Sequence, residues 1–294
     1  MIYVHHSSNK DPAFHLALEL SLLYAPWPNE VTDIVLTYMN QPSVIMGRFQ
    51  NPWMEVNLDL LRDNNVSLMR RMTGGGCVYH DEGNINFSVI TNRQDYNRSW
   101  ALQTLVQTMS YFGKELIENH RYDLYYKGGK VTGSAMRKTK DRFLHHFTLI
   151  GVGDGKFMAE ILNHNRDVSS IVANSKSVHS LRVPTEQLFL PLEWNSMMLS
   201  EIRTQFGKNW SSRDQGKLLD LPSSMLRAET SFLEQMNSLN WIYGETPDFE
   251  IVKDGHKFLV QNGIMKKNSM DFADVSLFEP SIKSLNLILT NLKK

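Results

Sequence analysis

The chain has 294 residues, of which 41% are hydrophobic and 21% charged, a composition typical of a globular protein and unlike that of a disordered chain. Its 31 basic and 31 acidic residues give a formal net charge of zero, which excludes the overall basic surface expected of a nucleic-acid-binding protein. The single cysteine, Cys77, excludes an internal disulfide and a metal site built from several cysteines.

The N-terminal segment resembles no targeting signal. It lacks the basic and then apolar order of a secretory signal, and it is too acidic and too poor in arginine for a mitochondrial presequence. No apolar run approaches the ~18 residues of a membrane-spanning helix. We therefore expect a cytoplasmic protein, or one of the mitochondrial matrix if the source is a eukaryote, with neither a membrane nor a nucleic acid as partner.

Helical and alternating apolar patterns divide most of the chain into predicted elements. In chain order, we expect a helix at 14–24, strands at 33–39 and 43–46, a helix at 55–64, strands at 66–72 and 84–91, a helix at 100–118, strands at 124–126, 130–136 and 143–152, and helices at 155–162 and 196–206. Strands and helices do not alternate regularly, as they would in a doubly wound parallel sheet, so the predicted fold class is α+β.

The sequence becomes turn-rich near residue 245, which predicts a domain boundary there. Beyond it, residues 249–259 predict a hairpin about Asp254-Gly255, and residues 285–292 predict a short helix. We therefore expect a main domain at 1–245 and a reduced C-terminal accessory domain at 246–294.

Three consecutive glycines follow the strand predicted at 66–72. Gly74, Gly75 and Gly76 let the backbone turn sharply and bring its N–H groups close to a ligand, and such a loop can cradle a phosphate. The preceding pair, Arg70 and Arg71, is suited to charge-assisted contacts with the same anion. Taken alone, a run of three glycines is more often an ordinary surface turn, so both interpretations stay open at this point.

A lysine stands before small residues in the segment 129–135, Gly-Lys-Val-Thr-Gly-Ser-Ala. On a strand, Lys130 can point its ammonium group into a cleft and neutralise charge on a transferring acyl-phosphate. The segment does not fit the Walker pattern, in which glycines precede the lysine at a fixed spacing. Taken alone, a solvated lysine at the end of a hairpin is the commoner interpretation.

Two pairs of polar residues suggest structural roles. His80 and Asp81 are expected to form hydrogen bonds that stabilise a turn, with an acid–base role as the alternative. His145 and His146 are adjacent on a predicted strand and therefore face opposite sides, which argues against a shared metal ion. We expect one of them to be packed and the other to form a hydrogen bond, and we expect no metal held by protein side chains.

Four stretches, taken together and in this order, resemble the lipoate–protein ligase family, which includes the mitochondrial lipoyltransferases of animals. They are GRFQNPWME at 47–55, RRMTGGGCVYHDEGNINFS at 70–88, GKVTGSA at 129–135 with DR and HH downstream at 141–142 and 145–146, and WIYGETPDF at 241–249. The similarity extends over most of residues 1–250.

The resemblance implies a central mixed sheet with flanking helices, as in biotin and lipoate ligases, and a two-step reaction. In the first step lipoate attacks the α-phosphate of ATP, with Mg²⁺ as counter-ion, to give lipoyl-AMP and pyrophosphate. In the second step the ε-amine of an acceptor lysine attacks the mixed anhydride, and AMP leaves. The implied acceptors are the lipoyl domains of 2-oxoacid dehydrogenase E2 subunits, the glycine cleavage H protein, or both, and we expect a monomer.

Carried over residue by residue, the resemblance implies that Lys130 is catalytic and holds both the lipoyl carboxyl oxygen and the phosphate. Arg71 matches the nucleotide-contacting arginine, and the segment 76–79 matches the loop that wraps ATP and the intermediate. The implied ligand-binding set is Arg71, Gly75, Gly76, Cys77, Val78, Tyr79, Lys130, Ser134 and Ala135. Cys77 is interpreted as a loop-lining residue, because the nucleophile of cysteine-dependent acyltransferases with this fold lies well downstream.

The chain departs from the family pattern in three places. Phe147 stands where the family has a glycine, His15 stands where it has an asparagine, and fewer than fifty residues follow Pro247. The C-terminal domain of full-length ligases is very roughly twice as long. Three functions therefore stay open: an ATP-dependent lipoate–protein ligase, which we favour, a lipoyltransferase that uses preformed lipoyl-AMP or a lipoylated carrier protein, and a non-catalytic lipoyl-AMP-binding module.

Overall fold

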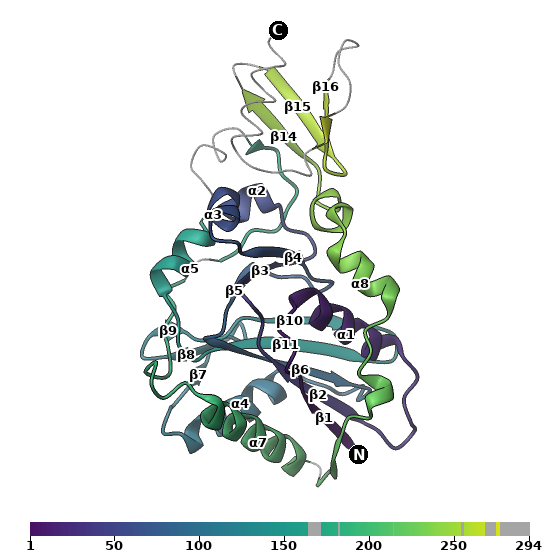
Figure 1. Ribbon diagram of the computed structural model, residues 1–294, viewed down its shortest axis with the longest axis vertical. Helices are drawn as coiled ribbons and strands as arrows, with labels where there is room; N and C mark the ends of the chain where they lie inside the picture. The colour runs from purple at the N-terminus through teal and green to yellow at the C-terminus, as the bar shows by residue number, and fades with distance from the viewer. Residues whose placement is uncertain (164–171, 182, 214, 254–255, 268–274, 277–294) are drawn as a thin grey trace. The chain divides into compact units, whose positions relative to one another are not determined.

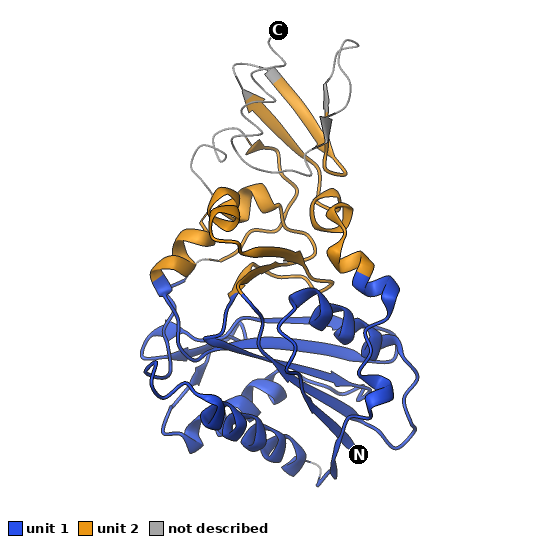
Figure 2. Cartoon of the chain, viewed as in Figure 1, with its two compact units in different colours: residues 1–41, 80–155, 182–233 blue, residues 42–79, 156–181, 234–294 orange. Residues whose placement is uncertain are grey.

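The computed structural model describes residues 1–163, 172–181, 183–213, 215–253, 256–267 and 275–276. The chain contains two compact units, each assembled from three segments (Figure 2). Unit 1 comprises Met1–Gln41, His80–Gly155 and Arg182–Leu233, and unit 2 comprises Pro42–Tyr79, Lys156–Leu181 and Glu234–Lys294. The domain boundary that we expect at residue 245 stays a prediction.

Unit 1 is built on a mixed six-stranded sheet in the order β10-β11-β6-β2-β1-β13 (Figure 1). Its strands are β1 (Ile2–His6), β2 (Asp33–Tyr38), β6 (Asn84–Thr91), β10 (Ser134–Lys138), β11 (Phe143–Ile150) and β13 (Leu218–Asp220). β1 is parallel to both β2 and β13, whereas the pairs β2–β6, β6–β11 and β10–β11 are antiparallel. The predicted α+β class with a mixed central sheet is therefore confirmed.

Strand alternation gives this sheet two chemically different faces. Along β6, Ile85, Phe87 and Val89 lie on one face, and Asn84, Asn86 and Ser88 lie on the other, followed by the apolar Ile90 near the end of the strand. The register extends the polar face to the neighbouring strands, because Asn86 is opposite Tyr38 of β2 and Ser88 is opposite His146 of β11. One face of the sheet can thus pack as an apolar core, while the other holds buried polar groups.

The apolar face is covered by α4 (Ser99–Tyr111) and α7 (Ser196–Ser212), which lie side by side (Figure 1). Phe87 stacks on Phe147 with ring centroids 5.3 Å apart, and the ring of Phe206 from α7 lies 4.6 Å from that of Phe87. Phe147, which replaces a glycine of the family pattern, is buried in this core. Its ring therefore fills the core and points away from the polar face of the sheet.

The polar face is covered by α1 (Pro12–Tyr24), on the side of the sheet opposite α4 and α7 (Figure 1). The helix begins where the Asp11 side chain accepts a hydrogen bond from the Ala13 N–H at 2.9 Å, and Pro12 supplies a suitable φ at the first helical position. Most of α1 is buried, including Glu19, so a carboxylate lies against the polar residues of the sheet.

A small sheet of unit 1, in the order β7-β8-β9, carries the predicted catalytic lysine. Its strands are β7 (Ile117–Glu118), β8 (Leu124–Tyr126) and β9 (Gly129–Lys130). Lys127 and Gly128 both have positive φ, 47° and 87°, and form the tight turn between β8 and β9. The turn fixes the register in which Lys130 pairs with Tyr125.

Unit 2 contains two sheets, in the orders β4-β3-β5 and β12-β14-β15-β16-β17. Their strands are β3 (Ser43–Met46), β4 (Ser67–Arg70), β5 (Val78–His80), β12 (Val172–Ala173), β14 (Phe249–Lys253), β15 (His256–Gln261), β16 (Ile264–Lys267) and β17 (Val275–Ser276). Helices lying wholly or partly in this unit are α2 (Pro52–Glu55), α3 (Leu58–Asp63), α5 (Gly155–Ile161), α8 (Thr230–Asn237) and the π-helix η2 (Asn240–Gly244). None of the helices in the described part of the chain is both long and apolar enough to cross a bilayer.

Strands β3, β6 and β8 have the predicted bounds, but other elements end elsewhere for local reasons. The helix expected at 100–118 ends at Tyr111, because Gly113 adopts a left-handed conformation with φ 69° and caps it. The strand expected at 130–136 is split, since Gly133 exchanges hydrogen bonds with Thr148 between β9 and β10. The helix expected at 285–292 lies outside the described residues.

Candidate functional site

The backbone of the glycine loop after β4, residues 74–76, packs directly against the backbone of Gly47. Gly75 has a φ of 90°, which side chains rarely tolerate. A Cβ atom on Gly47, at the end of β3, would lie 2.0 Å from the carbonyl oxygen of Gly75. A Cβ atom on Gly76 would lie 2.9 Å from the Ser180 hydroxyl, whereas one on Gly74 would meet no atom within 4 Å. Three of these glycines are therefore required by geometry.

Arg71 holds the loop from within. Its guanidinium donates to the carbonyl oxygens of Gly74 at 2.6 Å and Gly76 at 2.8 Å, and to the Thr73 hydroxyl at 2.9 Å. A further hydrogen bond of 2.9 Å reaches the Ile45 carbonyl on β3. The predicted nucleotide-contacting arginine thus also ties the glycine loop to the sheet.

Gln50 is a second organiser of the loop, and its side chain is fully buried. Its Oε1 accepts hydrogen bonds from the Gly47 N–H at 2.9 Å and from the Cys77 thiol at 3.2 Å. Its Nε2 donates to the Ser180 hydroxyl at 3.0 Å, which also accepts the Cys77 N–H at 2.9 Å. Cys77 therefore lines the loop with both its amide and its thiol engaged.

The segment that contributes Ser180 is itself fixed to α2. Glu55, buried at the end of α2, accepts hydrogen bonds from the ring of His179 at 2.9 Å and from the Ser180 N–H at 3.0 Å. The Val178 N–H donates to the Phe49 carbonyl at 3.0 Å. Residues 178–180 therefore lie along the motif at 47–55 and close one side of the glycine loop.

The predicted residues of unit 1 lie on β9 and β10. The Lys130 ammonium forms an ion pair with Asp123 at 2.8 Å, and both side chains are partly buried. The Lys130 backbone bonds to Pro184 and Glu186, so its strand is held from both sides. Ser134 and Ala135 begin β10.

The structure therefore brings the predicted residues together in two groups. In unit 2 the members are Arg71, Gly75, Gly76, Cys77, Val78 and Tyr79; in unit 1 they are Lys130, Ser134 and Ala135. Arg70 behaves differently from its predicted role. The sequence pattern suited both arginines to contacts with an anion, but the Arg70 side chain is fully buried and donates to backbone carbonyls, so that interpretation is wrong for Arg70.

A buried carboxylate anchors the polar face of the central sheet. Glu19 on α1 accepts hydrogen bonds from the Tyr38 hydroxyl at 2.8 Å and from the ring of His146, also at 2.8 Å. Burial raises the pKa of Glu19, but the charge and hydrogen bonds of its partners outweigh burial and hold the pKa below its usual range. The carboxylate is therefore ionised at neutral pH.

A second polar chain runs through the same unit. The Nδ1 of His15 lies 2.7 Å from the Asn40 carboxamide oxygen, and the Asn40 amide nitrogen lies 2.9 Å from Nδ1 of His80. The other ring nitrogen of His15 lies 2.9 Å from the Ser7 hydroxyl. His15, which replaces an asparagine of the family pattern, therefore bridges two buried polar groups and helps to orient His80.

The predictions for Asp81, His145 and His146 are confirmed, whereas the His80 ring bonds to Asn40, 40 positions away in the sequence. Asp81 accepts a hydrogen bond from the Gly83 N–H at 2.8 Å and stabilises the turn before β6. His145 packs in the apolar core with its Nδ1 2.7 Å from the Tyr96 hydroxyl, and burial, followed by His146, lowers its pKa to about 3. His146 takes the opposite face and bonds to Glu19.

The polar face also contains an unsatisfied acceptor. Among the described residues no group donates to Oδ1 of Asn86, which is buried. Such an atom usually marks the place of a water molecule or a polar ligand. The described residues contain no group of three or more His, Cys, Asp or Glu side chains arranged to hold a metal ion.

Comparison with known proteins supports one family. The model of the lipoyl protein ligase A/B catalytic domain matches residues 11–201. A Schizosaccharomyces pombe protein, named as a candidate lipoate-protein ligase A, is 33% identical over 82% of this chain and 70% of its own length. The mitochondrial lipoyl amidotransferase of Homo sapiens is 30% identical over 82% of this chain and 65% of its own length. The chain belongs to the lipoyl protein ligase A/B catalytic domain family.

Solved structures share the fold. LipL1 of P. falciparum, in complex with lipoate, superposes with a TM-score of 0.67 at 23% identity, covering 90% of this chain and 83% of its own. A bipartite lipoate protein ligase of Thermoplasma acidophilum, described with its E2 lipoyl domain, gives 0.65 at 20% identity, covering 82% and 94%. An ATP-bound lipoate-protein ligase A gives 0.64 at 20% identity, covering 82% and 96%.

Glu19 generates a prediction about pH and stability. Its pKa is depressed in the folded protein, so its stabilising effect is complete above the pKa of an unfolded glutamate, about 4.3, and is lost as the pH falls through the folded pKa. Glu19→Gln should cost about 1.5–3 kcal/mol of unfolding free energy at pH 7, and the difference from wild type should shrink below about pH 4. Urea unfolding across pH 3–7 measures this.

The exposed Glu30 provides the control, and Glu30→Gln should unfold like wild type at pH 7. A constant difference between Glu19→Gln and wild type down to pH 3 would contradict the assignment of a depressed pKa.

Proposed function

We propose that the chain is an ATP-dependent lipoate–protein ligase that uses the lipoyl-adenylate route. The lipoate carboxylate attacks the α-phosphorus of ATP and pyrophosphate leaves. The acceptor lysine amine then attacks the acyl carbon, AMP leaves with the bonding electrons, and the amine loses a proton. The observation that carries this proposal is the glycine loop, with Gly75 at positive φ and clamped by Arg71 and Gln50, in a chain of the lipoyl ligase family.

The residues present suit these ligands. A glycine-rich turn can bring backbone N–H groups close to phosphate oxygens, and Arg71 beside it adds a fixed positive charge. Mg²⁺ usually enters such sites on the phosphates with few protein ligands, where it neutralises charge on the nucleotide. The proposed ligand set is the one predicted from sequence: Arg71, Gly75, Gly76, Cys77, Val78, Tyr79, Lys130, Ser134 and Ala135.

Lys130 is the proposed catalytic residue. Its ammonium is paired with Asp123, and its backbone lies in a strand that is hydrogen-bonded on both sides. Little conformational entropy is therefore lost in positioning Lys130 when a substrate binds. In the reaction it would neutralise charge that develops on the carboxyl and phosphate oxygens, an electrostatic effect that needs no covalent intermediate.

The alternative function is a lipoyltransferase that takes preformed lipoyl-AMP or a lipoyl group from a carrier protein. The human relative named a lipoyl amidotransferase, at 30% identity, favours it. A lipoyl-AMP-binding module without turnover is disfavoured, because the chain has both the glycine loop clamped by Arg71 and the lysine, Lys130, on which the proposed reaction depends.

The proposed acceptor is a lipoyl domain of a 2-oxoacid dehydrogenase E2 subunit, as in the Thermoplasma system, with the glycine cleavage H protein as a second candidate. The proposed enzyme is a monomer with a catalytic domain at 1–245 and an accessory domain at 246–294. The cytoplasm is the proposed compartment, and the mitochondrial matrix replaces it if the source is a eukaryote, as the mitochondrial human relative suggests.

Pyrophosphate exchange distinguishes the ligase from the transferase. With lipoate and MgATP, a ligase should exchange labelled pyrophosphate into ATP and attach lipoate to an acceptor domain. A transferase should label the acceptor only from lipoyl-AMP or from a lipoylated carrier. Labelling from lipoyl-AMP without exchange would reject the ligase, and failure of every donor on folded protein would favour the binding module.

Lys130→Ala should lower kcat by about 10²–10³-fold, the usual cost of removing a transition-state electrostatic contact. Steady-state lipoylation of the acceptor measures the effect. Lys127→Ala, which removes an exposed lysine from the adjoining turn, should retain wild-type kcat. A kcat near wild type in Lys130→Ala would refute the catalytic assignment.

Gly75→Val should weaken lipoyl-AMP binding by about tenfold or more, because a β-branched residue disfavours the positive φ of this position. Calorimetric titration of lipoyl-AMP gives the affinity. Gly74→Ala is the matched control, since its methyl group would meet no atom within 4 Å. Equal losses in both variants would show that the positive φ of Gly75 is not what limits adenylate binding.

A further inference from the structure

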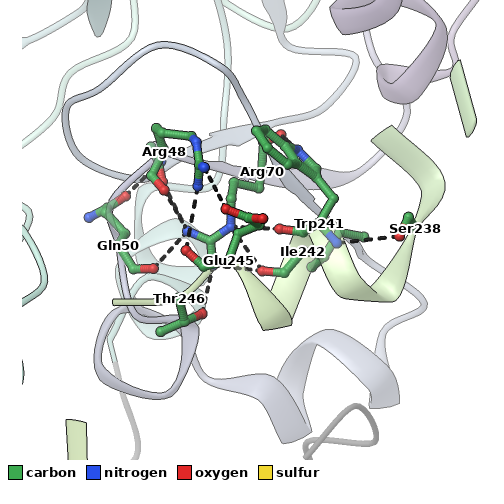
Figure 3. Close-up of polar contacts among 9 residues, drawn as sticks. Arg48, Gln50, Arg70, Ser238, Trp241, Ile242, Glu245 and Thr246 are labelled. Carbon is green, nitrogen blue, oxygen red and sulfur yellow. Dashed lines mark hydrogen bonds and ion pairs between the residues drawn. The ribbon is translucent and has the colours of Figure 1, made fainter. Parts of the chain in front are cut away.

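Arg70, at the end of β4, is the largest fully buried side chain among the described residues. Figure 3 shows its guanidinium between two segments that are far apart in the sequence. From one segment it reaches the carbonyl oxygens of Arg48 at 3.0 Å and Gln50 at 2.8 Å. From the other it reaches the carbonyl of Ile242 at 2.6 Å and the hydroxyl of Thr246 at 2.8 Å.

The C-terminal segment 241–246 supplies many of the hydrogen-bond acceptors that replace water around this buried guanidinium. Nε of Arg70 also lies 3.0 Å from the carbonyl oxygens of Trp241 and Ile242, both in the π-helix η2. Burial, followed by the nearby charge of Arg48, lowers the pKa of Arg70 to about 10, so the group remains charged at neutral pH. A buried charge is tolerated only when its hydrogen bonds are satisfied, so η2 and Thr246 must stay in place.

The contact is reciprocal. The Trp241 indole donates a hydrogen bond of 2.6 Å to the Arg70 carbonyl oxygen, so η2 also binds the backbone of β4. The Arg48 guanidinium lies 4.4 Å from the centre of the Trp241 ring and 2.5 Å from a carboxylate oxygen of Glu245. Aromatic contacts add to these bonds, since the ring centroids of Trp53 and Phe249 lie 5.3 Å apart. The segment is therefore joined to the rest of unit 2 by both polar and aromatic contacts.

Arg70 reaches the glycine loop by two routes. It is followed directly by Arg71, whose guanidinium holds the carbonyls of Gly74 and Gly76. It also fixes the backbone of Gln50, whose side chain holds Gly47 and Cys77. All of these residues belong to unit 2. The segment 241–246 and the glycine loop are therefore joined through one buried side chain.

We propose that Arg70 is a positioning residue through which the segment 241–246 sets the conformation of the glycine loop. The segment thereby supports adenylate binding without touching the adenylate. This inference rests on the proposed function for its catalytic consequence, but the coupling itself can be measured in the ligand-free protein.

The test uses Thr246→Val, which removes one hydrogen bond to Arg70 and keeps the side-chain shape, and Trp241→Phe, which removes the hydrogen bond to the Arg70 carbonyl oxygen and leaves a smaller ring. Amide hydrogen exchange of residues 73–77 in the full chain should become about fivefold faster in each variant, as expected for loss of one hydrogen bond. The affinity for lipoyl-AMP should fall by a similar factor. Thr246→Ser, which keeps the hydroxyl, should restore both values.

Glu245→Gln is the matched control, because it weakens a partly exposed ion pair in the same segment without removing a hydrogen bond to Arg70. It should leave exchange of residues 73–77 at the wild-type rate. Faster exchange at 241–246 alone, or a uniform rise throughout unit 2, would overturn the proposal. If wild type does not bind lipoyl-AMP but the exchange pattern is as expected, the coupling stands and the proposed function fails.

Discussion

Unit 2 depends on the burial of one positive charge. The guanidinium of Arg70 has no access to solvent, and it is surrounded by carbonyl oxygens from the motif at 47–55 and from η2. Because an unsolvated charge is costly, these segments cannot separate without breaking several hydrogen bonds at once. Arg71 and Gln50, which lie next to Arg70 or are bonded to it, in turn form hydrogen bonds that hold the glycine loop. The positive φ of Gly75 is therefore stabilised in part by contacts with residues far from the loop in the sequence.

Unit 1 depends on a different constraint, the alternation of β6 and β11. One face is an aromatic core in which Phe87, Phe147 and Phe206 are in contact. The other face holds Glu19 and His146 in mutual hydrogen bonds under α1. A polar network of this kind is stable only when nearly every group has a partner, and it specifies a single arrangement of helix and sheet. One face thus packs through apolar contacts, and the other through buried hydrogen bonds.

The sequence predicted those features that depend on local pattern. Strands β3, β6 and β8 have their predicted bounds, since continuous or alternating apolar residues and flanking turns define them. Strand β1 was missed, because its short run with two histidines lacks a strong pattern. The roles of Gln50 and Arg70 could not be predicted: Gln50 meets Ser180 across 130 positions, and Arg70 meets Trp241 across 171. Such pairings depend on tertiary structure alone.

The position of Phe147 has a consequence for how sequences of this fold can diverge. Its ring lies on the core side of β11, while His146 beside it lies on the polar side. Exchange of glycine for phenylalanine at this point therefore changes the volume to be filled beneath α7 and leaves the chemistry of the opposite face unaltered. The filling of the apolar core and the bonding of the buried polar network can accordingly change independently at two adjacent positions.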